Sequence, residues 1–379
     1  MKIVIVGSGN AGCLTALHYG LYTRNSNVEI ELIHTKNIPA EPVGQGTLTE
    51  PPELFWKALG FNWYNNPIYG TFKSGILYEG WGSVNEKVFH SFPSNNMAMH
   101  YSPSDMQEYV LKSNLFKVTE QEVDNLDDID ADYIFDCRGK PKDFSNYIKL
   151  KSPVNSVILG KPKWDLTEQY WTRSVATKDG WCFIIPANVK SKAHNNCVGY
   201  LYNNTITSYQ EAENNFLDMF DVNISKTFSF DNYMAKDPIV DDRIILSGNK
   251  FFFLEPLEST AVQAYLRWSR LTFDVLIKKS RSFNDIIVEF KKYIQETQNF
   301  ILWHYKFGSK YNSKFWNYAQ SIPLYDSKLE DMINYSRKLD KYDILPENDG
   351  GRSSSDLYSH FYPYSIKNWY DGMSYKNDY

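Results

Sequence analysis

The sequence predicts an α/β protein with a Rossmann-type dinucleotide-binding fold, an antiparallel β-sheet region in the middle of the chain and a helical C-terminal part. Three observations support this prediction. The chain opens with a strand, a glycine turn and a helix in "KIVIVGSGNAGCLTALHYGLY". Residues 171–203 alternate in the manner of antiparallel strands. From Val262 onward, apolar residues recur at helical spacing.

Composition indicates a globular chain with no nucleic-acid or membrane partner. Its 379 residues are 42% hydrophobic and 22% charged, enough to build one large domain or two to three interleaved ones. The net charge of -5 provides no reason to expect binding to nucleic acid or to an anionic membrane. No apolar run approaches the roughly 18 residues of a membrane span, and the N-terminus is a strand rather than a secretion signal. We therefore expect a cytoplasmic protein.

The cysteines and the aromatic residues lead to two further expectations. The four cysteines are widely spaced and contain no CxxC pair, which favours reduced thiols over a disulfide framework or a metal site. Aromatic residues make up 16% of the chain. Most of them must pack in the core, but such a supply also suits an enzyme that handles a flat organic substrate.

A glycine-rich turn directly follows the first strand, residues 2–6. Its sequence, "GSGNAG", fits the GxGxxG pattern between a strand and a helix. The first glycine permits the turn, the second lets the backbone approach a pyrophosphate, and the third lets helix and strand pack closely. Free N–H groups at the helix start attract phosphate. We expect dinucleotide contacts from Gly7, Gly9, Asn10, Ala11 and Gly12.

The second strand, residues 28–33, is followed by a departure from the usual pattern. His34 stands where a dinucleotide fold usually carries an acid for the adenosine ribose. The histidine could replace that acid as a neutral hydrogen-bonding partner of the ribose hydroxyls, or the contact could be lost.

The remaining elements follow in order along the chain. A Pro/Gly-rich loop leads into a short helix near residue 50, and strands are expected within "ADYIFDCRG" and "VNSVILGK". In the helical part, Phe283, Ile286, Phe290 and Ile294 form an apolar stripe that indicates core packing. The segment "PENDGGRSSSDLYSH" is typical of a surface loop or a disordered stretch.

Several further segments, in order along the chain, resemble the flavin-dependent tryptophan halogenase family. "NIPAEPVGQGTLTEP" is similar to the family's "IPTxGVGExT" loop, and "GTFKSGILYEGW" to its lysine segment. "FHSFPSN" resembles "HPF", and "LEPLESTAV" resembles "EPLESTG". "GWCFIIP" resembles "GWxWxIP", with Phe183 in place of the second tryptophan. "HYKFGSKYNSKFWNY" is similar to the block that ends in "FW".

This resemblance implies a Rossmann-type, GR2-like flavoprotein fold that binds FAD, with an antiparallel sheet and a helical region at the substrate. We accordingly expect FAD binding and the interleaved sheet in residues 1–265, a helical region over the substrate site in residues 266–340, and a loop-rich tail in residues 341–379. The implied reaction begins with reduced FAD and O2, which form a flavin hydroperoxide. The hydroperoxide oxidises chloride, bromide or iodide to hypohalous acid, which travels to an organic substrate.

The resemblance also implies partners. No nicotinamide site is evident in the sequence, so we expect a separate flavin reductase to supply reduced FAD. A small aromatic compound is the expected substrate. The sequence is compatible with a homo-oligomer.

The catalytic residues of the family match Lys73 and Glu258. Taken alone, a lysine on a strand is usually a solvated charge, and a glutamate at a helix start usually satisfies free N–H groups. The resemblance implies that Lys73 either hydrogen-bonds hypohalous acid or forms a haloamine with it. Glu258 would polarise the hypohalous acid or accept the ring proton. Glu255 is expected to shape the turn beside the flavin rather than to pair with Glu258.

Flavin and halide contacts are implied in the same way. Ser259, Thr260 and Ala261 offer hydroxyl and N–H groups at a helix start, a natural anion site that matches the family's halide position. Asn249 stands where many related flavoproteins carry Asp, and it can still hydrogen-bond the ribityl or pyrophosphate portion. The expected flavin contacts beyond the glycine turn are Gly44, Gln45, Gly46, Thr47, Gly248 and Asn249.

The expected substrate contacts are His90, Phe92, Tyr311, Phe315 and Trp316. Aromatic residues at such places are often packing, but these match the family's "HPF" and "FW" segments. Tyr311 stands about where members acting on free tryptophan carry a glutamate for the substrate ammonium. Because tyrosine cannot supply that charge, we expect an indole- or phenol-like substrate rather than free tryptophan.

Two alternatives remain open at the level of sequence. The first is a flavin-dependent monooxygenase or other oxidoreductase of the same fold, which would have no use for Lys73 and Glu258 together. The second is a catalytically inactive flavin-binding protein, with which His34, Asn249 and Phe183 are compatible.

Overall fold

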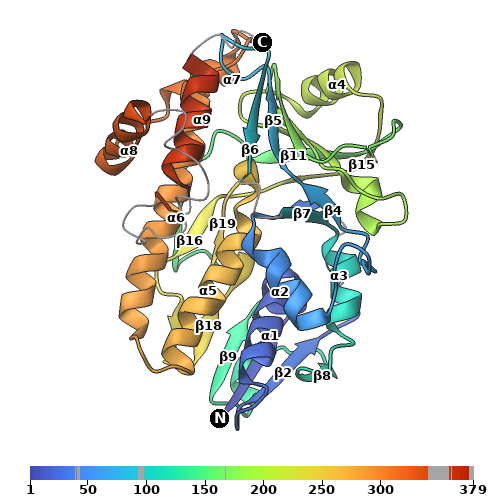
Figure 1. Cartoon of the computed structure of the whole chain (residues 1–379), viewed down its shortest axis with the longest axis vertical. Coiled ribbons are helices and arrows are strands. Elements are labelled where there is room, and N and C mark those ends of the chain that lie inside the picture. The colour runs from blue at the N-terminus through green and yellow to red at the C-terminus, as the bar shows by residue number, and fades with distance from the viewer. Residues whose placement is uncertain are drawn as a thin grey trace.

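The computed structural model describes residues 1–38, 40, 43–92, 98–166, 168–339, 358–359 and 361–374. In this part of the chain two large sheets lie toward opposite ends of the molecule, with helices α5 (Ala261–Leu276) and α6 (Phe283–Lys306) along one side (Figure 1). The predicted polar segment at residues 346–360 lies outside the described residues, apart from Tyr358 and Ser359.

The N-terminal unit is a six-stranded sheet whose central strand is the first of the chain. Its pairs are parallel except for the edge pair β17–β18. β1 lies between β2 and β9, so the strand order reverses there and a crevice opens beyond the strand ends. This confirms the predicted Rossmann-type unit. The strand order is β17 (Ile239–Val240), β18 (Ile244–Leu246), β9 (Tyr133–Asp136), β1 (Lys2–Val6), β2 (Glu29–His34) and β8 (Lys117–Glu120).

The second large sheet has seven strands and includes the predicted antiparallel region. Its pairs are antiparallel except for β12 and β5, which run parallel. Register partners lie on one face of a sheet, so Tyr78, Ser174 and Phe183 form one row across three strands. The order is β15 (Val222–Ser229), β11 (Ser156–Pro162), β14 (Val198–Tyr202), β13 (Gly180–Ile184), β12 (Thr172–Thr177), β5 (Gly75–Glu79) and β6 (Lys87–Ser91).

Two small sheets connect these units. In one, β7 (Ala98–Tyr101) pairs with both β3 (Gln45–Gly46) and β4 (Thr71–Lys73), which brings the predicted flavin loop beside the predicted catalytic lysine. In the other, β16 (Tyr233–Ala235) lies between β10 (Tyr147–Lys149) and β19 (Phe252–Phe253).

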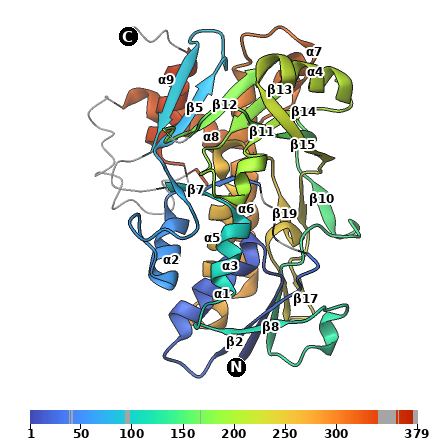
Figure 2. The ribbon, with the colours of Figure 1, turned by 90° about the vertical axis from the view of Figure 1, so that its right-hand side faces the viewer.

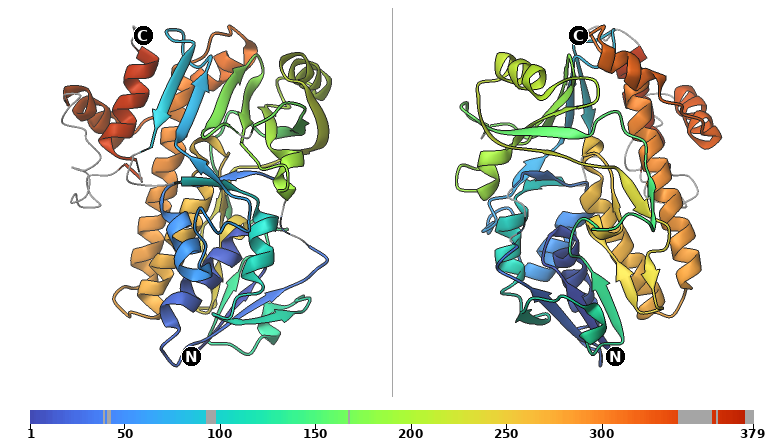
Figure 3. Two further views of the ribbon diagram at one scale, coloured as in Figure 1. Left: turned by 45° about the vertical axis from the view of Figure 1, so that its right-hand side comes forward. Right: turned by 180° about the vertical axis from the view of Figure 1, so that it is seen from behind.

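Helices cover the sheets, as Figures 2 and 3 show from other sides. α1 packs on α5, and α5 packs on α6. α6 begins with a capping box between Ser282 and Asp285, and its predicted apolar stripe is buried at Ile286, Phe290 and Ile294. The other α-helices are α1 (Asn10–Thr23), α2 (Glu50–Leu59), α3 (Pro103–Val110), α4 (Tyr209–Met219), α7 (Lys314–Ser321), α8 (Ser327–Lys338) and α9 (Pro363–Ser374).

Two helices bear on the expected division of the chain. The predicted boundary at residue 265 lies within α5, which packs on α1 of the N-terminal unit. The predicted loop-rich tail contains α9. Its buried residues Ile366, Trp369 and Met373 recur at helical spacing, and the helix packs against β6 and α8.

Two features of the described residues bear on partners. None of their helices combines the length and the apolar character needed to cross a membrane. Within the same residues, no three His, Cys, Asp or Glu side chains gather as they would around a metal ion.

Candidate active site

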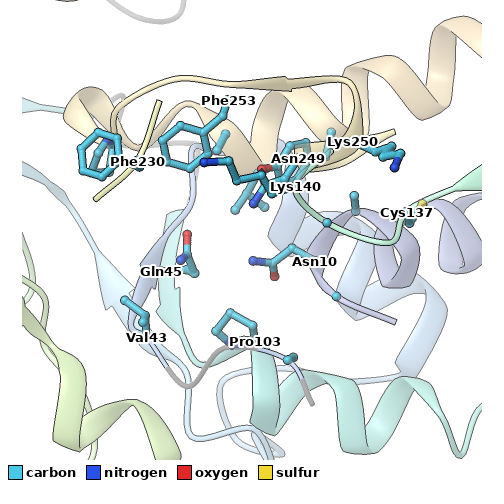
Figure 4. A pocket seen from close by; sticks show the side chains of 18 of the residues that line it. Asn10, Val43, Gln45, Pro103, Cys137, Lys140, Phe230, Asn249, Lys250 and Phe253 are labelled. Atoms are coloured by element: carbon cyan, nitrogen blue, oxygen red, sulfur yellow. The ribbon is translucent and has the colours of Figure 1, made fainter. Parts of the chain in front are cut away.

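A large cavity of about 1020 Å³ lies between the two units. At one end it is bounded by the turn after β1 and the segment after β9, and at the other by the inner face of the seven-stranded sheet. In Figure 4, Asn10 and Gln45 project into the open space from opposite sides, and Lys140, Asn249 and Phe253 border it above. Of the predicted residues, the cavity is lined by Gly7, Gly9, Asn10, Ala11, His34, Gly44, Gln45, Gly46, Asn249, Glu258, Ser259, Thr260 and Ala261.

The glycine turn has the geometry that a bound dinucleotide requires. Gly7 has φ +106°, and a Cβ there would lie 2.6 Å from the Cys137 carbonyl oxygen. A Cβ on Gly12 would lie 1.8 Å from the Gly7 carbonyl oxygen, so only glycine allows α1 to approach the turn. α1 starts at Asn10, and its first N–H groups have no partner within the helix. The turn therefore fits the pyrophosphate of FAD.

Three of the other predicted flavin residues hold the cavity wall in place. The Asn10 side-chain oxygen accepts a hydrogen bond from the Tyr101 hydroxyl, and the Asn249 side-chain oxygen accepts one from the Tyr265 hydroxyl, both at 2.6 Å. Thr47 is buried and accepts a hydrogen bond from the Met99 N–H at 2.9 Å. Thr47, together with Gly12 and Gly248, does not line the cavity but lies behind residues that do.

The turn between β19 and α5 carries unusual backbone geometry. Glu258 has φ +67° and Ser259 has φ +56°, in the left-handed region that L-residues other than Asn and Asp rarely adopt. Two such residues in succession cost free energy, and positions of this kind cluster at functional sites. The turn directs Glu258 and Ser259 to the cavity, and α5 begins two residues later at Ala261.

Lys73 is fully buried behind the cavity wall. Its Nζ donates to the Ser259 hydroxyl at 2.8 Å and to the Thr47 carbonyl oxygen at 3.2 Å. A Cβ on Gly46 would lie 2.9 Å from the same Nζ, so the glycine leaves room for the amine beside the predicted flavin loop. Burial lowers the pKa of Lys73 to about 7, although nearby Glu258 opposes this shift. At neutral pH a large fraction of the amine is therefore uncharged.

Glu258 is the centre of a buried hydrogen-bond network. Its Oε1 accepts a short hydrogen bond from the Tyr78 hydroxyl and lies 2.9 Å from His304 Nε2 and 3.4 Å from His90 Nδ1. Burial by itself would raise the pKa of Glu258, but His90 and the hydrogen bond to His304 hold it well below its usual value. Trp369 of α9 packs on the Tyr78 ring, with centroids 4.1 Å apart, and closes the network on that side.

The start of α5 fits the predicted halide position. Thr260 is the residue before the helix and is 3% exposed, and the first helical N–H groups, at Ala261 and beyond, have no partner within the helix. Ser259, Thr260 and Ala261 all line the cavity. A small anion at this position would meet both the N–H groups and the positive end of the helix dipole.

The predicted substrate residues divide into two groups. His90 and Phe92 lie next to the catalytic candidates, since the Phe92 ring centre is 5.0 Å from Lys73 Nζ and 6.1 Å from the His90 ring centre. Phe315 and Trp316 are 1% exposed in the core near Trp81 and do not line the cavity. Tyr311 is half-buried and also lies outside the cavity lining.

Two residues of the Glu258 network were missed by sequence reasoning. Tyr78 lies in the lysine segment, five residues after Lys73, and His304 lies in the "HY" of the last matched block. The sequence signal that could have identified these two residues is their position in segments that resemble the family. Their shared contact to Glu258 emerges only in the folded chain.

Comparison with known proteins agrees with this geometry. A family model described as tryptophan halogenase matches residues 2–126 and 142–360. Tryptophan 6-halogenase ThaL of Streptomyces albogriseolus is 20% identical, with 88% of this chain and 81% of that protein covered. Tryptophan 7-halogenase KtzQ of Kutzneria sp. (strain 744) is 26% identical over 174 residues, so the match covers 44% of this chain and only 31% of KtzQ.

Solved structures show the same fold. Xcc4156, a flavin-dependent halogenase from Xanthomonas campestris, superposes with a TM-score of 0.78 at 16% identity, covering 98% of this chain and 88% of that one. The α/β fold predicted from the sequence is thereby confirmed. Since the family model spans most of the chain, this protein is an enzyme of the flavin-dependent halogenases and belongs to the tryptophan halogenase family, as its motifs predicted.

Proposed function

We propose that this enzyme halogenates an electron-rich aromatic compound, indole- or phenol-like, with hypohalous acid that Lys73 and Glu258 direct to the ring. The observation that carries the proposal is the pair of buried ionisable side chains beside one cavity, with Lys73 0% and Glu258 2% exposed. Burying such groups is costly, and perturbed pairs of this kind concentrate at catalytic sites.

FAD fits the cavity at its glycine-turn end. The free N–H groups of α1 would bind its pyrophosphate, and the loop at Gly44–Thr47 and Asn249 would border the ring system and its ribityl chain. When bound and reduced, FAD together with O2 would supply the oxidising power that converts a halide into hypohalous acid. The halide would bind at Thr260 and Ala261 at the start of α5. A separate flavin reductase would provide the reduced cofactor.

Lys73 and Glu258 would then both act in the halogen-transfer step, Lys73 on the hypohalous acid and Glu258 on the acid and the ring proton. The neutral Lys73 amine can attack the electrophilic halogen to form a haloamine, with loss of water, or can hydrogen-bond the hypohalous acid. Glu258 can polarise the hypohalous acid and accept the proton that the ring loses. Ser259 connects the two, because its hydroxyl accepts the Lys73 hydrogen bond and it directly follows Glu258 in the chain.

A product assay tests this proposal. Purified enzyme with an external flavin reductase, FAD, NADH and bromide or chloride should convert indole or a simple phenol to the halogenated product. Mass spectrometry separates that product from a hydroxylated one. A hydroxylated product would assign the enzyme to oxygenation of the substrate, and failure with every aromatic and halide would favour a flavin-binding protein without catalysis.

Free tryptophan should be a poorer substrate than indole. Lys310 Nζ lies 5.2 Å from the Tyr311 ring centre, so neither residue offers a negative charge to a substrate ammonium. A charged hydrogen bond contributes about 1.5–3 kcal/mol, so its loss should lower kcat/KM for tryptophan at least about tenfold relative to indole. Competition between the two substrates measures the ratio. Equal values would contradict the proposed substrate class.

The reaction should accelerate as pH rises through about 7, the value to which burial lowers the pKa of Lys73. The neutral amine is the form that reacts with electrophilic halogen, so the rate should level off once Lys73 has lost its proton. Single-turnover rates with pre-reduced FAD, from about pH 6 to about pH 9, measure this without the reductase. A rate that falls over the same range would mean that the ammonium form holds the hypohalous acid by a hydrogen bond.

A further inference from the structure

The partners of Glu258 are distributed unequally between its two oxygens. The Tyr78 hydroxyl, His304 Nε2 and His90 Nδ1 all contact Oε1. Oε2 is buried and has no hydrogen-bond partner among the residues that the structure describes. Glu258 lines the cavity, and Oε2 is the carboxylate oxygen that no described residue already occupies. A buried carboxylate oxygen without a partner is costly, so its position points to a ligand or a reacting group.

The protonation of His304 follows from its two contacts. Nδ1 lies 2.7 Å from the Phe300 carbonyl oxygen, which can only accept, so Nδ1 carries a hydrogen. Nε2 lies 2.9 Å from Glu258 Oε1. Two lone pairs would repel each other at that distance, so one proton lies between these atoms. His304 and Glu258 therefore hold one shared proton.

We propose that His304 is a positioning residue for Glu258, and that the proton shared between Nε2 and Oε1 fixes the carboxyl group so that Oε2 serves the reacting halogen and aromatic ring. This inference rests on the proposed function of Glu258 and adds the group that orients it. Tyr78 completes the arrangement as a donor, because burial and Glu258 raise the pKa of its hydroxyl well above the usual value.

The proton balance of halogen transfer shows what this arrangement accomplishes. Transfer from hypohalous acid to an aromatic carbon forms the C–X bond and breaks the O–X and C–H bonds. The hydroxide leaves with the electrons of the O–X bond, and the ring recovers those of the C–H bond. Oε2 accepts the ring proton, which then converts the hydroxide to water. The proton shared with His304 remains in place, so the pair ends the cycle as it began.

The surroundings of His304 contain few other ionisable groups. His90 and Tyr78 approach the same Glu258 oxygen, and Lys73 interacts electrostatically with Glu258. The other faces of the imidazole are covered by the rings of Phe300 and Trp369, with centroids 4.6 Å and 4.1 Å away. Burial lowers the pKa of His304, whereas the hydrogen bond to Glu258 raises it.

Proton NMR of the protein without FAD tests the inference directly. A strongly downfield imidazole proton should be visible in the wild type and should vanish in both His304→Gln and Glu258→Gln. His18→Gln is the matched control, since His18 is also buried but lies away from the cavity lining, and it should leave the resonance unchanged. A wild-type spectrum without this resonance would overturn the inference.

Kinetics provide the second measurement. His304→Phe should lower kcat about 100-fold, a typical contribution of one acid–base group, with the FAD dissociation constant within about twofold of wild type. His304→Gln, which restores a neutral donor to Oε1, should recover part of kcat but show an altered pH profile. Wild-type kcat and pH profile in both variants would refute the positioning role. Because the NMR measurement needs no turnover, an inactive wild type would count against the proposed function alone.

Discussion

Replacing Lys73 with methionine should lower halogenation by about 1,000-fold or more, the upper range for removing one polar group that acts on a reacting centre. Methionine is similar in length and carries no amine, so neither haloamine formation nor a hydrogen bond to hypohalous acid is possible. Lys73 lies outside the cavity lining, behind Gly46 and Ser259. FAD binding should therefore stay within about twofold of wild type, a change of under 0.5 kcal/mol. Product formation and flavin fluorescence titration give the two values.

Stability measurements provide a control for this variant. Lys73 has an ordinary pKa of 10.5 and a pKa of about 7 in the folded protein, because burial disfavours the charged form. Between these values the unfolded chain binds more protons than the folded one, so wild-type stability should rise with pH across that window. Lys73→Met should lack this rise and should be at least as stable at pH 7. The exposed lysine variant Lys57→Met should retain full activity, and joint loss of FAD binding and activity in Lys73→Met would make Lys73 structural.

Replacing Glu258 with glutamine should lower kcat about 100-fold or more, since general acid–base groups contribute about 10²–10⁴. The amide oxygen can still accept from Tyr78, so the fold around Oε1 is retained. The amide nitrogen in place of Oε2 cannot take the ring proton. KM for the aromatic substrate should change little, because the lost interaction belongs to the reacting state rather than to binding. Steady-state kinetics with indole separates the two parameters.

Glu255→Gln is the matched control for this substitution. Glu255 lies in the same turn and is also buried, but its oxygens accept hydrogen bonds from Ser152 and Tyr305, and it does not line the cavity. Burial raises the pKa of Glu255 to about 7, against those hydrogen bonds, so a neutral amide resembles the form already present at neutral pH. The Glu255→Gln variant should therefore retain nearly full kcat. Equal losses of kcat in the two variants would show that activity depends on the conformation of the turn rather than on the Glu258 carboxylate.

Local signals predicted the nucleotide end of the cavity. The strand, glycine turn and α1 are neighbours in the chain, and the glycine requirements arise from contacts within that unit and with Cys137. The apolar stripe of α6 was equally evident, because helical periodicity reports burial directly. The same periodicity is present in α9 at Ile366, Trp369 and Met373, whereas the polar segment before this helix is typical of a loop-rich tail.

The sequence by itself determined the fold class, the family and the expectation that Lys73 and Glu258 share a reaction. It could not indicate that three groups would converge on one oxygen of Glu258. The hydrogen bonds from Tyr78 and His304 join residues 180 and 46 positions apart. Only the packing of β5, α6 and the strained turn before α5 brings them together. Burial, which lowers the pKa of Lys73 to about 7, is likewise a property of the folded chain, because a pKa depends on the water that packing removes.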